Sequence, residues 1–101
     1  MLKPNLLRMK VEVITPESSL FAGEAVSVSL PGIDGFFQVL NNHAPIISSL
    51  KAGEMKVELS ENVNQGSLST SIQLDGQKTL RIQIKGGVAE LLNNKLIILA
   101  E

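Results

Sequence analysis

Histidine, cysteine and paired carboxylates most often carry catalysis or hold a metal, and this chain offers few of them. It has one histidine, His43, and no cysteine. No serine, aspartate or carboxylate pattern around His43 matches a nucleophilic site, and a lone histidine makes a poor metal site. In "NNHAP" the asparagines favour a turn, and Ala-Pro favours extended backbone before the next strand. We therefore expect His43 to hold a loop by bonding backbone groups, and we expect no catalytic residue, metal or cofactor.

Two other stretches are candidates for chemistry. "PGIDG" has the glycines of a phosphate-binding loop but lacks their spacing and the lysine that follows. "GEMKVE" is similar to the turn of biotin or lipoyl carrier domains, in which an exposed lysine is modified. Here the lysine, Lys56, lies inside an alternating strand pattern and is followed by valine. A carrier domain modified at Lys56 is the alternative function, and a free-standing ligand-binding sandwich is a third.

Composition limits the classes of partner. The chain has 101 residues and a net charge of −1, with its charges scattered, so no basic patch favours nucleic acid. No apolar run approaches the ~20 residues of a membrane span, and the start lacks the apolar centre of a secretion signal. Hydrophobic residues make up 44% but charged residues only 19%. This surplus fits either a sandwich core rich in Val, Ile and Leu or a surface that another protein covers. The absence of cysteine fits a cytosolic protein.

The elements that must position these residues are strands, because the hydrophobic pattern has a period of two. Turn signals at short intervals, among them "AGE", "PGIDG", "KAG" and "KGG", separate roughly ten short strands, which predicts an all-β, antiparallel sandwich. We expect one domain over 1–101, with an N-terminal extension at 1–8 and a long hairpin or insertion at about 60–78. The alternation predicts a core that includes Val11, Val13, Val26, Val28, Ile82, Ile84, Ile97 and Leu99.

Three segments carry a family resemblance. Phe21-Ala22-Gly23, then "VSVSLPGIDGFFQVLNNHAPIISSLKAGEMKV" and "IKGGVAELLNNKLIILAE" resemble the epsilon subunit of F-type ATP synthases, in order and spacing, from Met9 to Glu101. Asn41-Asn42 replaces the family's Pro-Gly before the histidine. Met9 is an alternative start, and the family's C-terminal helical hairpin has no counterpart, as in a short form or a fragment.

The resemblance implies a non-catalytic rotor subunit in the central stalk. Such a subunit binds the gamma subunit and the membrane ring of c subunits, and it couples ion-driven rotation to ATP synthesis. It would lie on the cytoplasmic side of the bacterial inner membrane as a peripheral protein, with no membrane span, nucleic acid or small-molecule substrate. By position, the family's contacts with gamma and the c-ring fall on Pro31, Gly32, Ile33, Asp34, Gly35, Phe36, Leu40, Asn42, His43, Ala44, Pro45, Ile46 and Ile47.

Overall fold

The chain folds into strands, as its alternating sequence predicts. The structure, a computed structural model, describes residues 8–63, 66 and 68–101. These residues form seven strands: β1 (Met9–Ile14), β2 (Ser19–Gly32), β3 (Gly35–Leu40), β4 (Ile46–Leu59), β5 (Ile72–Asp75), β6 (Thr79–Leu92) and β7 (Lys95–Ala100). The predicted all-β sandwich is confirmed. Most of the expected N-terminal extension lies outside the described residues, and so do positions 64, 65 and 67 of the expected insertion.

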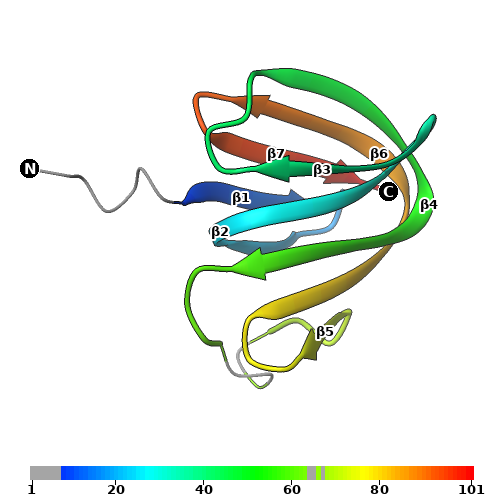
Figure 1. Cartoon of the computed structure of the whole chain (residues 1–101). Coiled ribbons are helices and arrows are strands. Elements are labelled where there is room, and N and C mark those ends of the chain that lie inside the picture. The colour runs from blue at the N-terminus through cyan, green and yellow to red at the C-terminus, as the bar shows by residue number, and fades with distance from the viewer. Residues whose placement is uncertain (1–7, 64–65, 67) are drawn as a thin grey trace, which may run out of the picture.

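Two long strands, β4 and β6, connect the two layers of the sandwich (Figure 1). Neighbouring strands follow the order β1-β7-β6-β4-β2-β3, with β5 on β6 and a further pairing of β1 with β2. Strands β4 and β6 curve through one side of the molecule, so each contributes its two halves to different layers (Figure 1). All pairings are antiparallel except β1 with β7, which is parallel.

The strands are fewer and longer than predicted, because three of the turn signals lie inside strands. Gly23, Gly53 and Gly86-Gly87 fall within the 14-residue strands β2, β4 and β6. Gly86 and Gly87 have φ values of 148° and 146°, which favour glycine. A Cβ on Gly87 would also collide with the carbonyl oxygen of Leu99. These glycines therefore lie within continuous strands instead of ending them.

The core fills the space between the layers. All seven strands contribute to it, β3 through Val39. Its largest fully buried side chains are Met9, Val11, Val13, Val28, Leu30, Met55, Ile72, Leu80, Ile82, Leu91, Leu96 and Ile98. The predicted burial of Val11, Val13, Val28, Ile82 and Ile84 is confirmed. Burying each such side chain contributes roughly 1.5–3 kcal/mol relative to leaving it exposed.

The predicted burial of Val26 and Leu99 is wrong, and Ile97 is only half-buried. At Val26 the pairing of β2 with β4 is irregular: Ala25 lies opposite Leu59 and Ser27 opposite Glu58. Such a bulge leaves one residue out of the alternation, here Val26.

Strand β7 uses the opposite phase from the predicted one. Leu96 pairs with Leu91 and Ile98 with Ala89, and all four are buried, so Leu99 faces outward. The apolar run "LIILA" has no polar residue that would reveal its phase.

Candidate partner interface

The hairpin between β2 and β3 presents apolar side chains to solvent. We call residues 31–36 the tip. Gly32 pairs with Gly35, so Ile33 and Asp34 form the reversal, and Gly35 has a φ of 127°. The side chains of Ile33 and Phe36 are 59% and 67% exposed. Two other predicted contact residues of the tip, Pro31 and Gly32, are buried. They lie under the reversal and not on its exposed surface.

The tip lies against the start of β4. The Ile33 N–H donates to the Ser49 carbonyl at 3.1 Å. An open hollow of about 570 Å³ is lined by both segments: Gly32 to Phe37 and Ile47 to Ser49. Ile47 is 76% exposed, whereas its neighbour Ile46 packs partly against the core. The structure therefore brings the tip together with one of the predicted contact residues of β4.

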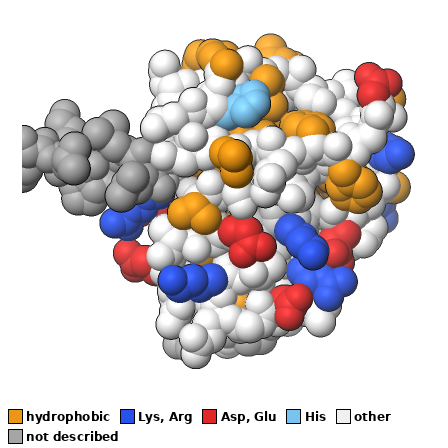
Figure 2. Space-filling view, viewed as in Figure 1, with side chains coloured by type: hydrophobic (Ala, Val, Ile, Leu, Met, Phe, Trp, Pro, Cys, Tyr) orange, Lys and Arg blue, Asp and Glu red, His pale blue; other side chains and the backbone are white. Residues whose placement is uncertain are grey.

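The second predicted segment forms a separate turn between β3 and β4. We call residues 41–45 the NNHAP turn. Leu40 before it is 53% exposed, and Asn42, His43, Ala44 and Pro45 are exposed. Asn42 has a φ of 65°, a left-handed conformation that asparagine tolerates. In Figure 2 hydrophobic side chains gather around the only histidine, in the upper part of the view.

His43 bonds backbone groups, but only those of residues close to it in the chain. Its backbone N–H donates to the Leu40 carbonyl at 3.0 Å, and its ring Nδ1 lies 2.7 Å from the Ala44 carbonyl oxygen. Because a carbonyl can only accept, the tautomer with a proton on Nδ1 makes this bond. The side chain is exposed, and it does not tie the turn to another described strand.

Sequence reasoning missed several exposed apolar residues beside this surface. They are Val26, Val88, Leu92 and Leu99. Val88 pairs with Leu99 across β6 and β7, and a further hollow joins Leu92 to Pro45 and Ile47. The sequence did contain a signal for Val88, because this residue follows the two glycines at which the alternation of buried and exposed residues in β6 shifts by one position. Asn94, which bonds to the NNHAP turn, was missed as well.

The outer face formed by 54–58 of β4 and 79–81 of β6 is polar, and its side chains pair with one another. Arg81 bonds Glu54 at 3.1 Å, and Thr79 bonds Glu58 at 2.7 Å. The hydrogen bond to Glu54 and the charge of Glu54 raise the pKa of the Arg81 guanidinium, with a smaller contribution from Asp75 against the effect of desolvation. Lys56 lies in the middle of this face, opposite Arg81 on one side and Ser29 on the other. It is in a paired strand and not at a hairpin turn.

Within the described residues we find no cluster of three or more side chains that could hold a metal ion. The same part of the chain contains no helix with the length and hydrophobicity needed to cross a membrane.

These features define a small β-sandwich that exposes apolar side chains at the tip and around the NNHAP turn. The chain belongs to the family described as "ATP synthase, Delta/Epsilon chain, beta-sandwich domain", whose model matches residues 8–70. It is 35% identical to the ATP synthase epsilon chain of Chlorobium limicola over 92 residues, which cover 91% of this chain and 88% of the relative. The epsilon chain of Chlorobaculum tepidum is also 35% identical, with 90% and 86% covered.

Other relatives are longer than this chain. An epsilon chain of Leptospira interrogans is 32% identical, and the match covers 93% of this chain but 61% of the relative. A chain in the mitochondrial ATP synthase structure from Euglena gracilis shares the fold, with a TM-score of 0.73 and 16% identity. That match covers 93% of this chain and 51% of the other. The carrier alternative at Lys56 finds no support in these comparisons.

Proposed function

We propose that this chain is a rotor subunit in the central stalk of an ATP synthase. It binds the gamma subunit and the c-ring and transmits ion-driven rotation to ATP synthesis. The observation that carries the proposal is the similarity to epsilon chains over 88% of a relative's length. The fold also recurs, at a TM-score of 0.68 and 14% identity, in a chain of the central stalk and c-ring structure of the Tetrahymena thermophila mitochondrial ATP synthase.

The exposed apolar residues supply the contact surface in this proposal. The tip meets the c-ring through Ile33 and Phe36, with Asp34 as the charged group beside them. The NNHAP turn and Ile47 meet gamma and the ring. Large exposed apolar side chains in a protein of this size favour a permanent partner, since burying them on binding is favourable.

The subunit itself is non-catalytic in this proposal, and its place is peripheral, on the cytoplasmic side of a bacterial inner membrane. A direct test is reconstitution of the ATP synthase from the same organism in vesicles, with and without this chain. We expect ATP-driven ion uptake per ATP hydrolysed to be high only when the chain is present. Equal uptake per ATP in its absence would contradict the proposal.

A further inference from the structure

The side-chain amide of Asn94 joins three separate segments of the chain. Its Oδ1 accepts the N–H of Asn42 at 2.8 Å. Its Nδ2 donates to Oδ1 of Asn41 at 2.9 Å and to the carbonyl of Arg8 at 3.0 Å. One acceptor and two donors are therefore all in use. The NNHAP turn, the start of β1 and the turn between β6 and β7 meet at this one side chain.

The backbone holds Asn94 in place. Asn93 and Asn94 are the two central residues of the reversal between Leu92 and Lys95, with φ values of 52° and 59°. Two such residues with positive φ match a two-residue hairpin turn, in which asparagine is favoured. The Lys10 N–H donates to the Asn94 carbonyl at 3.1 Å, so β1 also fixes the turn from its other side.

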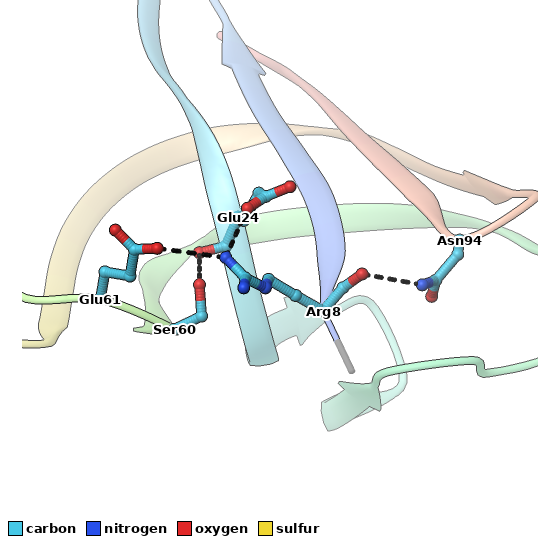
Figure 3. Close-up of polar contacts among 5 residues, drawn as sticks. All are labelled: Arg8, Glu24, Ser60, Glu61 and Asn94. Atoms are coloured by element: carbon cyan, nitrogen blue, oxygen red, sulfur yellow. Dashed lines mark hydrogen bonds and ion pairs between the residues drawn. The ribbon is translucent and has the colours of Figure 1, made fainter. Parts of the chain in front are cut away.

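Arg8, whose backbone carbonyl accepts the bond from Asn94, is itself held in place. The guanidinium of Arg8 bonds Glu24 and Glu61, each at 3.1 Å (Figure 3). Ser60 bonds the Glu24 carbonyl from the segment after β4. Asn94 therefore attaches the NNHAP turn to a part of the sandwich that is itself cross-linked.

We propose that Asn94 is the positioning residue of the NNHAP turn: it sets where Asn42 to Pro45 stand relative to the tip. This inference rests on the proposed function, because the turn is part of the proposed contact surface. The described bonds of His43, to the carbonyls of Leu40 and Ala44, join it only to residues close to it in the chain. The bonds from Asn94 link the NNHAP turn to the turn between β6 and β7. The Asn41 N–H, which donates to the Val26 carbonyl at 3.2 Å, links the NNHAP turn to β2.

Three variants separate positioning from general stability. Asn94→Gly keeps the positive φ without strain but removes all three side-chain bonds. Asn94→Asp still accepts from the Asn42 N–H but can no longer donate to Asn41 or to the Arg8 carbonyl. Asn93→Gly is the matched control, because Asn93 shares the turn and the positive φ and no hydrogen bond joins its side chain to another described residue.

Two measurements are made on each variant: amide hydrogen exchange of the free chain, and affinity for the gamma–c-ring complex of the same enzyme. For Asn94→Gly we expect exchange at Asn42 to rise, and the affinity to fall, each on the order of tenfold. Asn94→Asp should retain part of the protection at Asn42, because its carboxylate still accepts from the Asn42 N–H, and Asn93→Gly should match the unmodified chain. Unchanged Asn42 exchange in Asn94→Gly, or an equal effect of Asn93→Gly, would overturn the inference.

The two proposals fail in different ways. Faster Asn42 exchange with unchanged affinity overturns the role of Asn94 in binding and leaves the rotor proposal intact. An unmodified chain that does not bind the gamma–c-ring complex overturns the rotor proposal, and the binding role of Asn94 with it.

Discussion

The tip and the NNHAP turn both expose apolar residues, but they are built differently. The tip is a continuation of paired strands: β2 and β3 stay in register from Ser27 opposite Leu40 to Gly32 opposite Gly35. The NNHAP turn connects strands that do not pair with each other, β3 and β4, and side-chain amides hold it. The tip is therefore a local structure, whereas the turn depends on Asn94, 52 residues away.

This difference shows what each segment can tolerate. In the tip, backbone pairing and Gly35 determine the shape, so the side chains of Ile33 and Phe36 are free to serve a partner. In the NNHAP turn, side-chain hydrogen bonds such as that between Asn41 and Asn94 help to hold the backbone. Changes in the tip should therefore affect binding more than folding, and changes around the turn should affect both.

The largest expected effect comes from the double variant Ile33→Ser, Phe36→Ser. Removing two exposed apolar anchors should lower the affinity for the gamma–c-ring complex by about 100-fold, since a few such residues usually dominate an interface. The free energy of unfolding should change by less than about 0.5 kcal/mol, because both side chains are exposed. Titration calorimetry and thermal unfolding measure the two quantities.

Gln38→Ser is the control, because Gln38 lies on β3, as Phe36 does, and is exposed and polar. Its affinity should equal that of the unmodified chain. A double variant that binds as tightly as this control would remove the tip from the interface.

The sequence predicts the tip better than the turn, for a physical reason. Alternation and glycine are local signals, and they predicted the fold, five of the eight core residues named from the alternation, and the turn at 31–35. They failed where the phase of a strand depends on its neighbours, as at Val26, which lies in a bulge defined by β4, and at Leu99 in an unbroken apolar run.

Asn94 could not be predicted in this way. "NN" indicates a turn, but the partners of its amide, Arg8 and Asn42, lie 86 and 52 residues away in the chain. Only the folded arrangement brings them together. The contact surface itself was placed by family resemblance, and its residues remain a prediction that the binding measurements above test.

A smaller effect is expected from Gly35→Ala. The φ of 127° is strained for any residue with a Cβ, although nothing lies within 4 Å of the added atom. We expect a loss of about 1 kcal/mol in the free energy of unfolding and a measurable loss of affinity, because the tip must shift to relieve the strain. Gly76→Ala is the matched control: its φ of 81° and open surroundings give similar strain in the turn between β5 and β6. Equal affinities of the two variants would show that the shape of the tip is unimportant.

The smallest effect should come from His43→Ala. The lost ring contact is exposed and joins neighbouring residues, His43 and Ala44, while the backbone bond from His43 to Leu40 is retained. We therefore expect a change of about 0.5 kcal/mol or less in the free energy of unfolding. Asn94→Gly, which removes three longer-range bonds, should cost about 1–2 kcal/mol by the same measure. Denaturant titration of both variants ranks the two residues. If His43→Ala proved as costly as Asn94→Gly, the turn would be held from within, and its contrast with the tip would disappear.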